Sequence, residues 1–212
     1  MKKLVVALIV LFAASGASAG LTGLGIGIHG GIISGYDNPS LETGLEGFLD
    51  TLGVFDMADF EMPDDMKNFG AHVNIGTLRV IEFDIALDYA WQKKTLFEGA
   101  ELKFNDFSIS GSVRKSFPIA VFKPYVGAGL ATHIMAYTIE YNGNIYPIVD
   151  PNEDVSIEDE TVIGYHFKAG VALDFPLFPL TPYAEWKYNT IQTSGESSKY
   201  SQINLGITLD LP

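Results

Sequence analysis

The stretch GYHFKAGVALDFPLFPLTPYAEWKY, residues 164–188, decides the fold of this chain. Every second residue of its first half is apolar, and the residues between them are polar or small. The apolar set comprises Tyr165, Phe167, Ala169, Val171 and Leu173, and it resumes after a proline-rich turn with Ala184, Trp186 and Tyr188. Because successive side chains of a β-strand point to opposite faces, this period of two predicts two strands joined as a hairpin.

The same alternation recurs along the chain and predicts eight strands in all. Six further segments carry it, near residues 24–33, 68–76, 82–91, 106–114, 125–134 and 202–211. The chain also holds 22 glycines, 14 phenylalanines and 10 tyrosines, with few long helical patterns. Aromatic and β-branched residues favour strands, so we predict an all-β fold.

The connections between these strands alternate in length. Short ones are expected near residues 77–80, 117–122 and 175–180, and longer ones at residues 36–67, 93–103, 140–161 and 192–199. Outer-membrane barrels combine short periplasmic turns with longer external loops. The pattern therefore predicts a closed eight-stranded antiparallel up-and-down transmembrane β-barrel with both ends of the domain on the periplasmic side.

The apolar side of each predicted strand is too bulky for the narrow interior of eight strands. It includes Tyr89, Trp91, Tyr165, Phe167, Trp186 and Tyr188, whereas the opposite set is rich in glycine, alanine and serine. A soluble barrel of this size puts its apolar side inward. We therefore expect the bulky side to face lipid, with aromatic girdles at both interfaces. A soluble exported barrel is the architectural alternative.

The first 19 residues read as a secretory signal peptide. Lys2 and Lys3 precede an apolar run at residues 4–14, and small residues lead to Ala19. The run is shorter than the roughly 20 residues of a spanning helix. We predict cleavage after Ala19, which leaves an outer-membrane β-barrel domain at residues 20–212.

The amino-acid composition limits which binding partners and covalent attachments this protein can have. The chain has 13 bases, 26 acids and a formal net charge of −13, which argues against nucleic acid. It has no cysteine, so neither a disulfide framework nor a lipoprotein anchor is available. A weak repeat also matches Phe117-Pro118 with Phe175-Pro176, and Pro124-Tyr125 with Pro182-Tyr183. It indicates one turn design used twice, because proline at the first residue of a strand costs no ladder bond.

The runs KPYVGAGLA at residues 123–131 and TPYAEW at residues 181–186, with the closing strand, resemble a known family. It is the eight-stranded outer-membrane β-barrel family that includes the OmpA transmembrane domain and OmpX- and OmpW-like proteins. The resemblance covers nearly the whole predicted mature chain. It implies a location in the outer membrane of a Gram-negative-type bacterium, with outer-membrane lipid around the barrel, but no particular chemistry.

The closing strand resembles the signal by which the barrel assembly machinery recognises such proteins. Asn204, Gly206, Leu209 and Leu211 fit its spacing, but the chain departs from it by ending in Leu211-Pro212 without an aromatic residue. The resemblance thus implies the assembly machinery as a partner of this strand.

The residues able to carry chemistry fall on the predicted lumen side. They are His29, His72, His133 and His166, the acids Glu82, Asp84, Asp88, Asp106 and Glu185, and the bases Arg114, Lys168 and Lys187. Because buried charges must be paired, we predict an interior ion network, and we assign no catalytic, cofactor-binding or metal site. A metal or proton site at the histidines is the sharper alternative. We also expect Lys168 to lie opposite Lys187, compensated by Glu185 and the acids of residues 82–91.

Acids gather in the predicted external loops. Residues 36–66 hold nine acids and no base, and Leu41, Leu45, Phe48, Leu49 and Leu52 follow Pro39-Ser40 at helical spacing. A short helix capped by Ser40 is predicted there. The Asp-x-Asn-x-Asp run at residues 150–154, followed by the acids of residues 158–160, resembles the start of a calcium loop, but Val155 stands where that loop requires glycine and Thr161 where it requires glutamate. A surface partner or divalent cations are the candidate ligands of these loops.

We predict a non-enzymatic outer-membrane barrel with a structural or surface-interaction role through its acidic external loops. A narrow channel or small-molecule conduit is the alternative, although eight strands leave an interior filled by side chains. A lipid-modifying enzyme is a third class, and it requires a nucleophile and a base close together near the membrane face.

Overall fold

The computed structural model describes residues 23–37, 65–78, 81–97, 100–141, 144–147, 160–175, 178–192 and 197–211. Within these ranges the chain forms nine strands. They are β1 (Gly23–Asp37), β2 (Met66–Leu78), β3 (Ile81–Phe97), β4 (Ala100–Ser116), β5 (Phe122–Tyr141), β6 (Asn144–Pro147), β7 (Glu160–Leu173), β8 (Leu180–Gln192) and β9 (Ser197–Leu211). In this described part, no helix has the length and hydropathy needed to cross a membrane.

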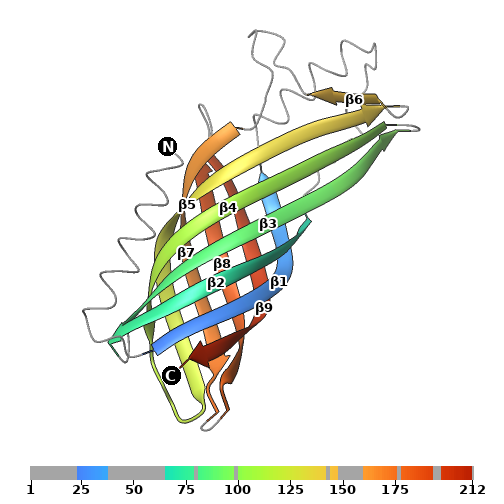
Figure 1. Ribbon diagram of the computed structural model, residues 1–212. Coiled ribbons are helices and arrows are strands. Elements are labelled where there is room, and N and C mark those ends of the chain that lie inside the picture. The colour runs from blue at the N-terminus through green and yellow to red at the C-terminus, as the bar shows by residue number, and fades with distance from the viewer. Residues whose placement is uncertain are drawn as a thin grey trace.

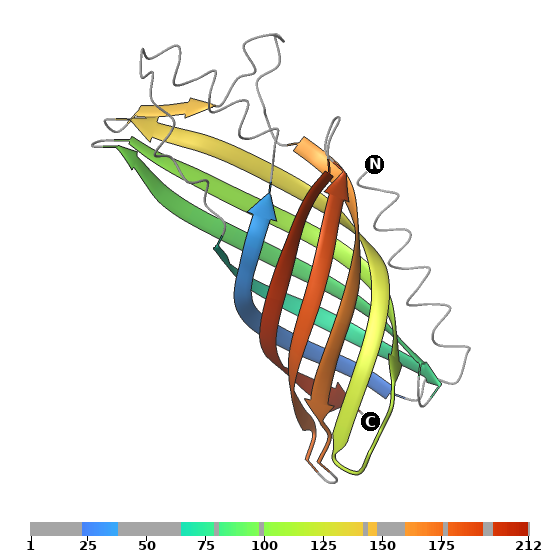
Figure 2. The ribbon, with the colours of Figure 1, turned by 180° about the vertical axis from the view of Figure 1, so that it is seen from behind.

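Eight of the strands close into a barrel in which each strand pairs antiparallel with its neighbours (Figures 1 and 2). The order is β1-β2-β3-β4-β5-β7-β8-β9, and β9 returns to pair with β1. Leu24 pairs with Leu211 where the barrel closes, so the start of β1 and the end of β9 lie side by side. The predicted closed eight-stranded antiparallel barrel is confirmed.

The alternation of side chains also follows the prediction. Bulky apolar residues face outward: Leu130 and Leu205 are each 66% exposed, and Trp186 is 46% exposed. The intervening set faces the lumen, where His133 and His166 are each 1% exposed. Outward phenylalanines at Phe117, Phe122, Phe175 and Phe178 lie at the end with the short turns. A band of exposed apolar side chains around a closed barrel is stable only in lipid.

One predicted loop is wrong, because residues 93–103 are largely strand. β3 continues to Phe97 and β4 begins at Ala100, so only two residues connect them. Lys93 pairs with Lys103 and Thr95 pairs with Glu101 within this hairpin. Beyond the apolar band the outward side chains of these strands are charged or polar, and on β4 the apolar Leu102 and Phe104 face inward, so the segment lacks the apolar-outward alternation that reveals a membrane strand. The predicted alternation of long and short connections therefore fails at this hairpin. It fails again between β8 and β9, because residues 197–199 of the predicted longer loop 192–199 belong to β9, and Gln192 pairs with Ser197.

The upper ends of β3, β4 and β5 extend past the other strands as a projecting sheet (Figures 1 and 2). The short strand β6, which was not predicted, pairs with residues 138–141 of β5 and adds to this sheet without joining the barrel wall. The described part of β2 reaches β3 only as far as the pair of Lys67 with Trp91. Beyond that pair, the free edge of β3 has no partner strand among the described residues.

Three other predictions fall outside the described residues. They are the signal peptide of residues 1–19, the helix after Ser40 and the calcium-like segment of residues 150–154. Each stays a prediction.

Candidate functional site

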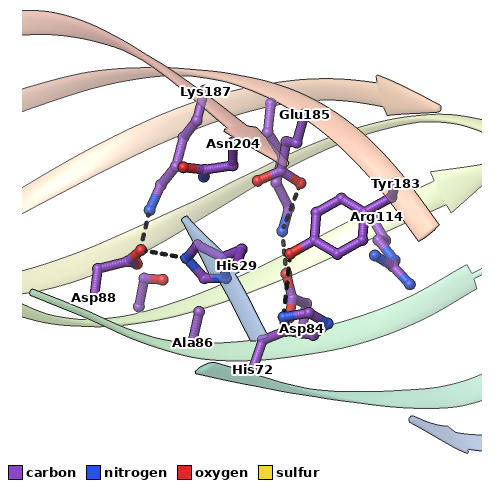
Figure 3. Close-up of a pocket in the computed structure, with 12 residues that line it drawn as sticks. His29, His72, Asp84, Ala86, Asp88, Arg114, Tyr183, Glu185, Lys187 and Asn204 are labelled. Carbon is purple, nitrogen blue, oxygen red and sulfur yellow. Dashed lines mark hydrogen bonds and ion pairs between the residues drawn. The ribbon is translucent and has the colours of Figure 1, made fainter. Parts of the chain in front are cut away.

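The middle of the lumen is held by ion pairs between opposite walls (Figure 3). Lys168 of β7 and Lys187 of β8 are register partners, as predicted. Lys168 forms an ion pair with Asp84 of β3, and its Nζ lies 3.6 Å from Glu185 Oε2. Lys187 Nζ lies 3.6 Å from Asp88 Oδ2. The prediction that Glu185 and the acids of β3 compensate the two lysines is therefore confirmed.

A second charged cluster lies toward the end with the short turns. Arg114 of β4 forms an ion pair with Glu82 of β3. Lys123 Nζ lies 2.6 Å from Glu82 Oε1, and Ser116 Oγ donates to the same oxygen at 3.2 Å. The Arg114 guanidinium carbon lies 4.9 Å from the centre of the Tyr125 ring. This cluster ties β3, β4 and β5 together through one buried carboxylate.

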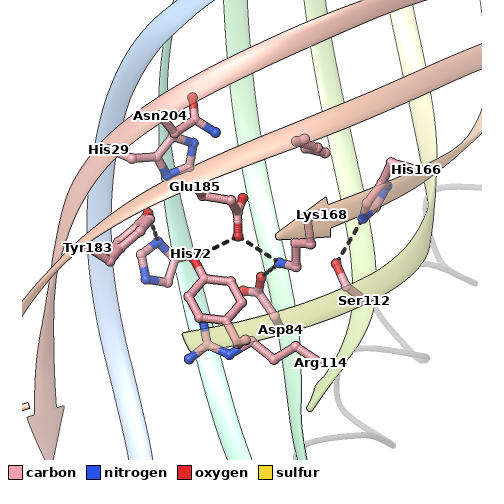
Figure 4. A network of polar contacts seen from close by, with 12 residues as sticks. His29, His72, Asp84, Ser112, Arg114, His166, Lys168, Tyr183, Glu185 and Asn204 are labelled. Atoms are coloured by element: carbon pink, nitrogen blue, oxygen red, sulfur yellow. Dashed lines mark hydrogen bonds and ion pairs between the residues drawn. The ribbon is translucent and has the colours of Figure 1, made fainter. Parts of the chain in front are cut away.

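The repeated Pro-Tyr motif has a structural reason that the sequence pattern did not reveal. Tyr125 pairs with Gly170 of β7, and Tyr183 pairs with Gly206 of β9. A Cβ atom on either glycine would lie 2.5 Å from the facing tyrosine ring. Each glycine thus leaves the space that its tyrosine occupies in the lumen. The hydroxyl of Tyr125 then donates to Glu185 Oε2 at 3.0 Å. Glu185 in turn lies beside Lys168 in the ion network (Figure 4).

The four histidines all face the lumen but do not converge on one point. Their nearest polar partners are Asp88 for His29 at 2.6 Å, Thr208 for His72 at 2.9 Å, Asp106 for His133 at 2.8 Å, and Ser112 for His166 at 2.9 Å. Among the described residues, no group of three or more histidine, cysteine or acidic side chains is arranged to hold a metal ion. Each histidine instead links two or more strands through a polar contact.

An apolar layer fills the lumen nearer the other end of the barrel. It consists of Ile33, Tyr36, Met66, Leu102, Phe104, Met135, Tyr137, Val162, Ile191 and Tyr200, all buried. The Phe104 ring lies 4.6 Å from the Tyr137 ring and 5.2 Å from the Tyr36 ring, measured between centroids. Sequence reasoning expected only small and polar residues inside and missed this layer. The available signal was that these aromatic residues fall on the lumen side near strand ends.

A small cavity lies within the charged part of the lumen. A cavity of about 20 Å³ lies among His29, Asp84, Asp88, Lys168 and Glu185 (Figure 3). About 10–15 Å³ of such volume is needed for one water molecule, so this cavity holds roughly one. The lumen is therefore a packed core of ion pairs capped by an apolar layer.

The outward side chains change from apolar to charged at the external ends of β3, β4 and β5. Lys93 Nζ lies 2.6 Å from Glu101 Oε2, and Lys103 forms an ion pair with Glu140. These exposed pairs stand beyond the apolar band. The hydrogen bond from Lys103 lowers the pKa of Glu140, and the same bond raises the pKa of Lys103. The row of charges marks where the lipid-facing surface ends.

A closed eight-stranded barrel with a filled lumen and an apolar outer band is the architecture of a membrane-embedded β-barrel protein. Solved structures of such proteins are similar to this chain, although comparisons of its sequence found no relative. No protein-family model matches the chain, and no curated protein sequence matches it. Similar solved structures include Neisserial surface protein A, with 15% identity, 90% of this chain and 98% of that chain covered, and a TM-score of 0.58.

Two further structures share the fold. Ail, the attachment invasion locus protein of Yersinia pestis, was solved in complex with the heparin analogue sucrose octasulfate. It is 10% identical over 89% of this chain and 99% of its own, with a TM-score of 0.53. The outer membrane protein OprG of Pseudomonas aeruginosa is 10% identical over 90% of this chain and 97% of its own, with a TM-score of 0.50.

The chain therefore has the fold of the eight-stranded outer-membrane β-barrel proteins. Together with the exposed apolar band, this fold places it in the outer membrane of a Gram-negative-type bacterium, with its outer face against lipid.

Proposed function

We propose that this protein is a non-enzymatic surface-interaction barrel whose membrane part anchors an acidic external end. The observation that carries the proposal is the filled lumen. Ion pairs such as Lys168 with Asp84 cross the barrel from β7 to β3, and an apolar layer lies above them. Because the interior is a core, the surfaces left for specific recognition are at the external end.

Two features of the external end support a binding role. The projecting sheet of β3 to β6 extends beyond the barrel, and among the described residues no strand pairs with the β2-facing edge of β3 beyond Trp91 (Figure 2). Exposed strand edges are sites where another chain can add a strand. The segments 38–64 and 148–159 carry seven and five acids and no base, so the partner that fits is positively charged.

The filled lumen also argues against the channel alternative, because a conducting path needs connected space. Enzymatic chemistry on lipid would need a base at the outward face, and the four histidines face the lumen instead. The similarity to Ail extends to the fold only. Its heparin analogue is a polyanion, and the acidic external segments of this chain would repel such a ligand.

Removing the external charge is expected to abolish binding to a basic partner. The barrel, reconstituted in discs of zwitterionic lipid, is tested against immobilised polylysine, with heparin as the opposite probe. One variant replaces residues 38–64 and 148–159 by short turns, and a matched one keeps their length but converts every Asp to Asn and every Glu to Gln. Both should bind polylysine about tenfold or more weakly, and binding by the unaltered barrel should weaken with salt.

The result that would contradict this proposal is polylysine binding by the neutralised barrel as tight as that of the unaltered barrel. Tighter binding of the unaltered barrel to heparin would contradict it as well. A heat-dependent shift in gel migration verifies that each variant still forms a closed barrel.

A further inference from the structure

A groove of about 560 Å³ lies on the outer surface at the external ends of β2, β3 and β4. Phe69, Tyr89 and Trp91 form its apolar floor, and Lys93 and Lys103 lie at its charged end. The rings of Tyr89 and Trp91 are stacked with 5.8 Å between centroids. The Tyr89 hydroxyl donates to Asn105 Oδ1 at 2.7 Å, which fixes this pair of rings at the membrane boundary.

Three lysines lie beside this aromatic floor, two of them lining the groove. Lys93 and Lys103 are register partners on β3 and β4, and Lys67 of β2 is the register partner of Trp91. All three lie on the outward side of their strands. In a chain with twice as many acids as bases, three lysines on neighbouring strands form a local basic patch. Apolar rings below ammonium groups are suited to a lipid whose acyl chains end in an anionic headgroup.

The carboxylates beside the patch do not prevent such binding. Glu101 and Glu140 pair with Lys93 and Lys103, and the side chains of both pairs are substantially exposed. Exposed ion pairs of this kind are weak. An ammonium group has three donors, so each lysine can keep its carboxylate and still donate to a headgroup oxygen.

We propose that this groove is a binding site for a phosphorylated lipid of the outer leaflet, with Lys93 and Lys103 as the phosphate ligands and Trp91 against the acyl chains. The source of the phosphate is a membrane lipid, because the apolar floor faces the bilayer. The site is independent of the acidic external segments and of the partner proposed for them.

Binding is measured by native mass spectrometry of the purified barrel in detergent micelles titrated with bisphosphorylated lipid A. The same lipid without phosphates is the comparison probe. The unaltered barrel should bind the phosphorylated form about tenfold more tightly. Lys93→Gln with Lys103→Gln should remove this preference, and Lys93→Arg with Lys103→Arg should keep it.

The matched control is Lys115→Gln with Lys199→Gln, which removes two exposed lysines from other parts of the barrel surface and should keep the preference. Equal binding of the two lipid forms would overturn the proposal. It would also be overturned if the control lost the preference to the same extent, or if inorganic phosphate displaced the lipid completely. Heat-dependent gel migration verifies that each variant is folded, and the arginine variant separates loss of charge from loss of structure.

Discussion

Replacing Asp84 with asparagine is expected to destabilise the barrel by about 3–5 kcal/mol, because it leaves a buried lysine without its main partner. Asp84 and Lys168 are 6% and 5% exposed. After the change, the described acid nearest to the Lys168 ammonium is Glu185, at 3.6 Å. The free energy of unfolding is measured by urea titration in lipid vesicles, with tryptophan emission as the signal.

Two comparisons isolate the role of this charge. The double variant Asp84→Asn with Lys168→Met removes both charges and should recover at least half of the loss, since a buried pair can often be replaced by apolar side chains at little cost. Glu101→Gln breaks the exposed pair with Lys93 and should cost no more than about 1 kcal/mol. A loss below about 1 kcal/mol for Asp84→Asn would show that this ion pair does not hold the lumen together.

Replacing Gly170 with alanine is expected to cost about 1–3 kcal/mol through crowding of the lumen. The new Cβ atom would lie 2.5 Å from the Tyr125 ring and 2.7 Å from the carbonyl oxygen of Ala184. The backbone oxygen cannot turn aside as a side chain can, so the strands must separate. The same urea titration measures the loss.

The matched control is Gly111→Ala, which replaces another glycine within a barrel strand. No atom lies within 4 Å of its added Cβ, so we expect a neutral effect or a gain of about 0.4–1 kcal/mol from the less flexible unfolded chain. Equal effects at the two positions would mean that the space beside Tyr125 is not confined, and that the Tyr-Gly pairing does not explain the repeated motif.

The membrane strands were predictable because lipid imposes a strict rule on them. Every outward residue within the band must be apolar, so the alternation around residues 164–188 shows both the strands and the direction in which Tyr165 and His166 point. For the same reason, the polar and small residues that alternate with the apolar ones could be assigned to the lumen. The fold and the set of buried charges could thus be inferred from the sequence.

The rest depends on contacts across the barrel. Lys168 could be expected to need an acid, but its pairing with Asp84 depends on how β7 and β3 face each other through the lumen. Tyr125 and Tyr183 fit inside only because a glycine lies opposite each in the register. The projecting part of β3 and β4 stands beyond the lipid, where outward side chains need not be apolar, so the sequence pattern predicts a loop there.

The central claim is that the bulky side chains of the strands face lipid and the polar ones face a filled lumen. The chain's two tryptophans test it directly, since Trp91 and Trp186 are both on the outward side. Single-tryptophan variants, Trp186→Phe and Trp91→Phe, are reconstituted in vesicles whose acyl chains carry bromine, a short-range quencher. Strong quenching of both tryptophans is the predicted result. Emission unchanged by brominated lipid would place the aromatic residues inside the barrel and contradict the account.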